Sequence, residues 1–170
     1  MNTALGVTIT QGETDLLFTK KLHAPQELVF TMFAEAEHVK QWWGPEDWTM
    51  PFCSIDFRPG GEWRYCIRNS EGEEHWSRAV YRNIISPELI SFTDQFITAA
   101  GDEIKGMPSK QVTITLDQEA ETTNLQVRIQ LKSAAELKQL IDMGFGRGFP
   151  ETLNHLSEHL YQSIKQEKDL

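Results

Sequence analysis

Residues 53–67, CSIDFRPGGEWRYCI, predict a β-hairpin at the centre of the fold. Pro59-Gly60-Gly61 suits a three-residue hairpin loop with glycine at its last, left-handed position, here Gly61. The predicted cross-strand pairs are Phe57–Trp63, Ile55–Tyr65 and Cys53–Ile67 on one face, and Arg58–Glu62 and Asp56–Arg64 on the other. Because the first face is apolar and the second pairs opposite charges, we expect the hairpin to cover a core on one side only.

A slip of this register by one residue would mix apolar and charged side chains. It would place Phe57 opposite Glu62, because side chains alternate between the two faces of a strand. The preferred register also puts Cys53 and Cys66 on opposite faces of the hairpin. We therefore expect no disulfide between them.

The rest of the chain predicts further strands and helices around this hairpin. Alternating apolar residues and turn-forming breakers indicate strands over residues 15–23, 48–58, 62–69, 75–85, 88–97, 112–116 and 125–131. Helical spacing of apolar residues indicates helices over residues 25–34, over residues 37–42 and from residue 133 onward. The last helix carries an apolar stripe of Leu153, Leu156, Leu160 and Ile164. We expect one α+β domain over residues 1–170, with residues 1–14 as a polar N-terminal extension.

The composition argues against several classes of partner. The 170 residues carry a formal net charge of −9, which repels phosphate backbones and anionic lipid, so we expect no nucleic-acid and no membrane partner. No apolar run is long enough to span a bilayer, and the N-terminus does not have the pattern of a signal peptide. Two cysteines suit a reducing compartment, so we expect a cytoplasmic protein.

Four segments in matching order resemble one known family. They are LHAPQELVF at residues 22–30, QWWGP at 41–45, DFRPGGEW at 56–63 and PELISFTD at 87–94. The chain resembles, over about residues 15–160, the family named after the activator of heat shock protein 90 ATPase, in the START-like or SRPBCC superfamily. The resemblance implies a helix-grip fold: a curved antiparallel sheet of six to seven strands around a long C-terminal helix, two short helices after the first strand, and a cavity between sheet and helix.

One segment departs from the pattern of this family. Residues 143–150, MGFGRGFP, contain three glycines and a proline where the long helix should begin. Each glycine weakens a helix by roughly 1 kcal/mol relative to alanine, so we expect a break here. The break is either a flexible lid over the mouth of the cavity or an ordinary bend between two helices.

Seven aromatic side chains are the candidate ligand-binding residues: Trp43, Trp63, Tyr65, Tyr81, Phe92, Phe145 and Phe149. Trp63 and Tyr65 share the apolar face of the hairpin, and Tyr81 and Phe92 belong to neighbouring strands. Ligand cavities are mostly apolar with a few polar groups, which the two tyrosine hydroxyls would supply. The alternative is that these aromatic side chains only fill the core.

The sequence has no motif for a catalytic nucleophile, a phosphate loop or a dinucleotide, and we expect no cofactor. His155 and His159 stand four residues apart, a spacing that could hold a metal, but a solvated helix face is the expectation, and we expect no metal site. Asp94, Arg64 and His75 could meet as acid–base partners, whereas paired surface charges are the simpler interpretation.

Three functions follow as hypotheses. The first is non-catalytic binding of a small hydrophobic or aromatic molecule in the cavity between the sheet and the last helix. The second, implied by the resemblance alone, is a co-chaperone module that binds a chaperone. The third is an enzyme working in the cavity, such as a cyclase or hydrolase, which would need a buried polar group with a perturbed pKa. A homodimer through an edge strand or the tryptophan-rich end is an open alternative.

Overall fold

A nine-stranded antiparallel sheet forms the body of the computed structural model, which describes residues 2–168. The strands are β1 (Asn2–Ala4), β2 (Val7–Gln11), β3 (Asp15–Leu22), β4 (Trp48–Ile55), β5 (Glu62–Asn69), β6 (Glu74–Ile85), β7 (Leu89–Ile97), β8 (Lys110–Glu119) and β9 (Thr122–Gln130). The helices are α1 (Gln26–Ala34), α2 (Ala36–Trp42), α3 (Ala134–Asp142) and α4 (Phe145–Lys168). The strand order across the sheet is β1-β2-β3-β9-β8-β7-β6-β5-β4.

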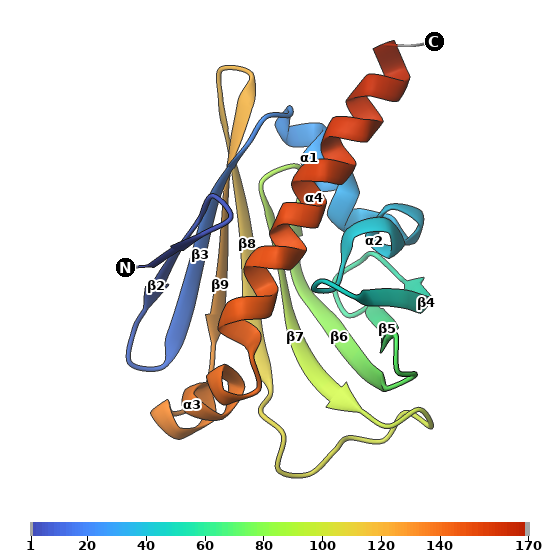
Figure 1. Ribbon diagram of the computed structural model, residues 1–170, viewed down its shortest axis with the longest axis vertical. Coiled ribbons are helices and arrows are strands. Elements are labelled where there is room, and N and C mark those ends of the chain that lie inside the picture. The colour runs from blue at the N-terminus through green and yellow to red at the C-terminus, as the bar shows by residue number, and fades with distance from the viewer. Residues whose placement is uncertain (1, 169–170) are drawn as a thin grey trace.

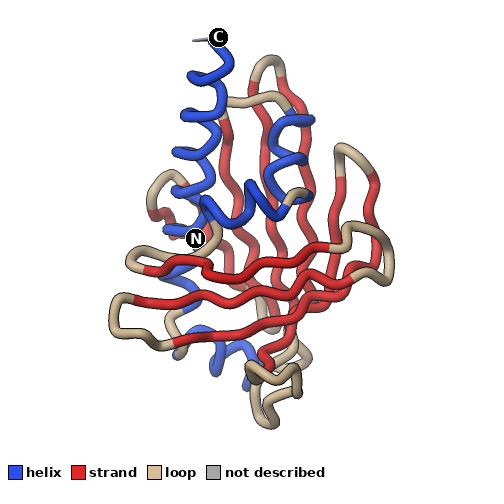
Figure 2. Tube along the Cα trace, turned by 90° about the vertical axis from the view of Figure 1, so that its right-hand side faces the viewer, coloured by secondary structure: helices blue, strands red, loops and turns tan. Residues whose placement is uncertain are grey.

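Helix α4 crosses one face of the sheet diagonally (Figure 1). The sheet is strongly bent, so that strands at its two ends run in crossing directions (Figure 2). Leu153, Leu156 and Leu160, spaced three and four residues apart, are almost completely buried and belong to the same core as the inward side chains of the sheet. The predicted α+β class, with a curved antiparallel sheet and a long C-terminal helix, is therefore confirmed. Across residues 2–168, no helix combines the length and the apolar character needed to cross a membrane.

The N-terminal residues are part of the sheet, which corrects the prediction of a polar extension over residues 1–14 and of six to seven strands. Strand β2 pairs with β3, with Ile9 opposite Phe18, and β1 pairs with β2. Val7 is fully buried in the core. The threonine-rich composition concealed these strands because only one face of an edge hairpin needs to be apolar.

The central hairpin has the predicted faces but a different register. Ile55 lies opposite Trp63 and Cys53 opposite Tyr65, a shift of two residues from the prediction. The shift arises because β4 ends at Ile55, so that residues 56–61 form a wider loop. Because the register shifts by an even number of residues, every side chain stays on the face that was predicted for it. Cys53 and Cys66 form no disulfide, as predicted.

The loop of this hairpin also uses its glycines differently from the prediction. Gly60, with a φ of 83°, takes the left-handed conformation that was predicted for Gly61. The Gly60 N–H donates to the carbonyl of Tyr81 (2.8 Å), and the Tyr81 N–H donates to the carbonyl of Gly61 (3.0 Å). These two hydrogen bonds extend the pairing of β5 with β6 into the loop.

The predicted break before the last helix is confirmed, but it is shorter than expected. Helix α3 ends at Asp142, Gly144 has a φ of 92°, and α4 begins at Phe145. Gly146, Gly148 and Pro150 are helical, which corrects the prediction of a break through Pro150. Phe149 and Pro150 are buried, so packing against the sheet offsets the poor helix propensity of this segment.

Candidate functional site

A cavity of about 380 Å³ lies between the sheet and the first turns of α4. Its walls come from strands β4 to β9, the loop after α2, the α3–α4 junction and α4. Glu46, Met143 and Arg147 line it and are exposed, so the cavity reaches solvent between that loop and that junction. This volume lies at the lower end of the range for small-molecule sites.

Five of the seven predicted aromatic residues line this cavity: Trp43, Tyr65, Phe92, Phe145 and Phe149. Trp63 and Tyr81 do not line it, so their placement in the cavity wall was wrong. Trp63 stacks on Tyr65 with ring centroids 4.4 Å apart and is covered by Trp43 at 4.8 Å. Tyr81 packs between Phe57 (5.2 Å) and Phe92 (6.0 Å), so both residues fill the core beside the cavity.

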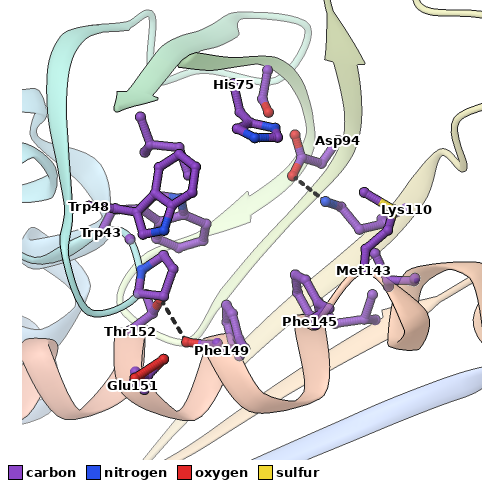
Figure 3. A pocket seen from close by; sticks show the side chains of 18 of the residues that line it. Trp43, Trp48, His75, Asp94, Lys110, Met143, Phe145, Phe149, Glu151 and Thr152 are labelled. Atoms are coloured by element: carbon purple, nitrogen blue, oxygen red, sulfur yellow. Dashed lines mark hydrogen bonds and ion pairs between the residues drawn. The ribbon is translucent and has the colours of Figure 1, made fainter. Parts of the chain in front are cut away.

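Aromatic rings from distant parts of the chain come together in the wall of the cavity (Figure 3). Phe145 and Phe149 stand one helical turn apart on α4 and stack with an interplanar angle of 14°. Trp43 meets Phe149 edge to face at 5.9 Å. The preceding residue, Trp42, is buried and donates from Nε1 to the carbonyl of Met32 (3.1 Å), which fixes the end of α2 and hence the position of Trp43.

A buried ion pair lies in the wall of the cavity (Figure 3). Asp94 on β7 and Lys110 on β8 are direct cross-strand neighbours, and Lys110 Nζ lies 3.3 Å from Asp94 Oδ2. Asp94 is only 3% exposed and Lys110 only 5%. The Tyr65 hydroxyl also donates to Asp94 Oδ2 (3.3 Å), whereas Asp94 Oδ1 is buried and finds no hydrogen-bond partner among the described residues.

The surroundings of this pair are aromatic. Lys110 Nζ lies 4.5 Å from the ring centroid of Phe96 and 5.2 Å from that of Phe145, both within the range of a cation–π contact. Burial, together with the nearby Asp94 carboxylate, raises the pKa of Tyr65 well above its ordinary value. The Tyr65 phenol therefore stays protonated at neutral pH and acts as a hydrogen-bond donor. A buried ion pair is often no more stabilising than an apolar pair, so stability alone gives little reason for these charges.

The sequence interpretation missed Lys110 and gave Asp94 the wrong partner. His75 lines the cavity, but Arg64 lies on the opposite face of the sheet, because it alternates with the inward residues Trp63 and Tyr65. Asp94 is buried, which also overturns its interpretation as a surface charge. The alternation of inward and outward residues along β7 and β8 could have predicted that Asp94 and Lys110 are buried. Each of the two charged residues shares its strand face with buried apolar residues, Ile90 and Phe92 for Asp94, and Val112, Ile114 and Leu116 for Lys110.

The histidines of α4 attach this helix to α2 and to the loop that follows α2, contrary to the expected solvated face. His155 Nδ1 lies 2.9 Å from the carbonyl of Gly44, and its Nε2 lies 3.1 Å from Glu46 Oε2. His159 Nε2 lies 3.0 Å from His38 Nδ1 on α2. Residues 2–168 bring together no group of three or more histidine, cysteine or acidic side chains that could hold a metal ion.

Comparison with known proteins places this architecture in a family. No curated protein matches the chain. A solution structure of a protein from Arthrobacter aurescens superposes with a TM-score of 0.88 at 18% identity, covering 92% of both chains. A solution structure from Staphylococcus epidermidis has a TM-score of 0.77 at 27% identity, covering 92% of this chain and 94% of that one.

The crystal structure of an AHSA1 protein from Silicibacter pomeroyi has a TM-score of 0.71 at 18% identity, covering 88% of this chain and 99% of that one. Likenesses at 18% identity show a shared fold and carry no information on ligands. The family model described as "Activator of Hsp90 ATPase homolog 1-like protein" matches residues 23–161, which is most of the chain. The resemblance inferred from the four sequence segments is thereby confirmed, and the chain belongs to this family.

Proposed function

We propose that this protein binds a small hydrophobic or aromatic molecule in the cavity between its sheet and α4. The observation that carries the proposal is the cavity itself, which is open to solvent at one end and lined mainly by aromatic and aliphatic side chains. An apolar space of about 380 Å³ that nothing apolar fills lowers the stability of the folded state, because the side chains around it lose packing contacts. A bound apolar molecule would restore those contacts.

Naphthalene and indole are suitable probes because each has the size of one or two aromatic side chains. Titration calorimetry and thermal unfolding should show saturable binding of at least one of them to the intact protein. A probe at 100 times its dissociation constant should raise the free energy of unfolding by about 2.7 kcal/mol. Failure of both probes to bind would contradict the proposal.

A cavity-filling variant locates the binding. Val112 is 3% exposed and lines the cavity, so Val112→Phe places a ring inside it. The matched control is Val80→Phe, since Val80 is partly exposed on the opposite face of the sheet. We expect Val112→Phe to abolish binding and Val80→Phe to leave it unchanged, with circular dichroism confirming that both variants are folded. Equal affinity in the two variants would place the probe elsewhere.

An enzyme acting in the same cavity is the second candidate, and the buried Asp94–Lys110 pair favours it. A carboxylate and an amine held together in an apolar site can move a proton to or from a bound molecule. The test is chemical: mass spectrometry of each bound probe after prolonged incubation with the protein. Recovery of every probe unchanged would leave binding as the only activity supported.

A further inference from the structure

The buried Asp94–Lys110 pair presents two polar atoms of opposite character to one cavity. Asp94 Oδ2 already forms the ion pair with Lys110 and accepts a hydrogen bond from Tyr65. Asp94 Oδ1 is buried and has no partner in the described part of the chain, although Asp94 lines the cavity. A buried carboxylate oxygen without a donor is energetically costly, so this atom is a site for a hydrogen-bond donor on a ligand.

Lys110 offers the complementary group. Its ammonium has three N–H donors, and Asp94 is the one carboxylate that it meets among the described residues. Nζ also lies over the faces of Phe96 and Phe145. An aromatic face is a weaker acceptor than an oxygen atom, so Lys110 can still donate to an oxygen atom of a ligand.

The charges around the site favour a neutral ligand. Lys110 and Asp94 cancel each other, and Tyr65 is held in its neutral form. An anionic ligand would lie beside the Asp94 carboxylate, and a cationic one beside the Lys110 ammonium, and both of these residues are almost completely buried. A neutral group that donates and accepts at the same time satisfies both residues.

Resting on the proposed function, we infer that the cavity selects hydroxyl-bearing aromatic molecules, such as phenols and aryl alcohols. The ligand hydroxyl donates to Asp94 Oδ1 and accepts from Lys110 Nζ. Its ring lies against the aromatic walls formed by Trp43, Phe145 and Phe149. Asp94 and Lys110 thus determine which of the apolar molecules that fit the cavity bind tightly.

Three probes of nearly equal size test the inference: 2-naphthol, 2-methoxynaphthalene and naphthalene. The first donates and accepts, the second only accepts, and the third does neither. We expect 2-naphthol to bind about tenfold or more tightly than 2-methoxynaphthalene in titration calorimetry, because a hydrogen bond to a charged group is among the stronger ones. Equal binding of all three would overturn the inference and leave the proposed function standing, whereas binding of none would overturn both.

The variant Asp94→Asn converts the acceptor into a donor. Its amide oxygen would stay with the two donors, Lys110 and Tyr65, and its NH₂ group would replace Oδ1. The advantage of 2-naphthol over 2-methoxynaphthalene should then disappear while naphthalene still binds. Persistence of that advantage in a folded Asp94→Asn protein would overturn the inference.

Two further variants complete the experiment. Asp94→Asn leaves the Lys110 charge buried without its partner, which can prevent folding. The double variant Asp94→Asn/Lys110→Met removes both charges and should also bind naphthalene without favouring 2-naphthol. Asp142→Asn is the matched control, because Asp142 pairs with Lys138 on the exposed surface of α3, and it should keep the ranking of the unmodified protein.

Discussion

Gly60 and Gly61, adjacent in the β4–β5 loop, are required for different physical reasons. Gly60 has a φ of 83°, but a Cβ added there would meet no atom within 4 Å. Gly61 has no such backbone angle, but a Cβ on it would lie 2.0 Å from the carbonyl oxygen of Asp56. The first glycine supplies conformational freedom, and the second supplies space for a close approach of two backbone segments.

Alanine substitutions should separate these two roles. Gly60→Ala should lower the free energy of unfolding by about 1 kcal/mol, the cost of a left-handed conformation for a residue with a Cβ. Gly61→Ala should cost about 3 kcal/mol, the upper end of the usual cost of overpacking, because the backbone itself must move. Urea denaturation followed by tryptophan fluorescence measures both values. A loss in Gly61→Ala no larger than that in Gly60→Ala would contradict the close approach of Gly61 to the carbonyl of Asp56.

At the scale of elements, the N-terminal hairpin is an integral part of the sheet. Strand β2 protects the edge that β3 would otherwise expose, and Lys20 donates to the carbonyl of Leu5 in the β1–β2 turn (2.9 Å). Burial lowers the pKa of Lys20 from its ordinary value, as expected when an ammonium is partly desolvated. The hairpin therefore contributes to the stability of the whole sheet through Val7, which is fully buried.

The variant Val7→Ala tests this contribution. It removes two buried methyl groups, so the free energy of unfolding should fall by about 1.6 kcal/mol, at about 0.8 kcal/mol per group. Thr10→Ala on the same strand is the control, and because Thr10 is exposed its effect should be within about 0.5 kcal/mol. Chemical denaturation of both variants gives the comparison. If the two variants were indistinguishable, β1 and β2 would not be part of the cooperatively folded unit.

At the scale of the whole molecule, histidines hold α4 over the cavity. The His38–His159 contact joins α2 to α4, and the His155 contacts join α4 to the loop at the cavity mouth. Burial, with a smaller contribution from His38, lowers the pKa of His159 below its ordinary 6.5. On the side of His38 away from His159, the Glu35 carboxylate lies 3.5 Å from Nε2. We therefore expect the docking of α4 to be sensitive to pH.

The direction of this pH dependence follows from the lowered pKa. Well above pH 6.5 His159 is neutral in both the folded and the unfolded chain, so its full contribution to stability is present. As the pH falls from 6.5 through the folded-state pKa, the unfolded chain takes up the proton more readily and the free energy of unfolding decreases. The contribution of this one group is at most about 1.4 kcal/mol per pH unit.

We expect the unmodified protein to lose stability between pH 7.5 and pH 5.5. His159→Gln, which can still hydrogen-bond to His38, should lose less over the same interval. The exposed His23 provides the control His23→Gln, which should follow the unmodified protein. Urea denaturation at the two pH values measures all three proteins, and identical pH dependence in His159→Gln and His23→Gln would contradict the assignment.

Local periodicity in the chain was enough to predict the strands from Asp15 onward, the apolar stripe of α4 and the faces of the central hairpin. Such patterns depend on neighbours a few residues apart, since side chains repeat every two residues in a strand and every 3.6 in a helix. Tyr65 and Phe92 were placed in this way, because an apolar residue on the inward face of a strand must meet the interior. Trp43 was chosen from the QWWGP segment, and Phe145 and Phe149 from the glycine-rich segment before the last helix.

Contacts between distant residues decided the rest. The hairpin register depended on Gly60 and Gly61 pairing with Tyr81, which no pattern within the hairpin itself reveals. The Asp94–Lys110 pair forms because β7 and β8, which are joined by a long loop, place these two residues opposite each other. Their burial excludes water and so strengthens the interaction between the two charges. Trp63 and Tyr81 face the same interior as the cavity residues, and only the packing around them separates filled core from open space. A cavity is a property of side chains brought together from the whole chain, so its outline cannot be obtained from any one segment.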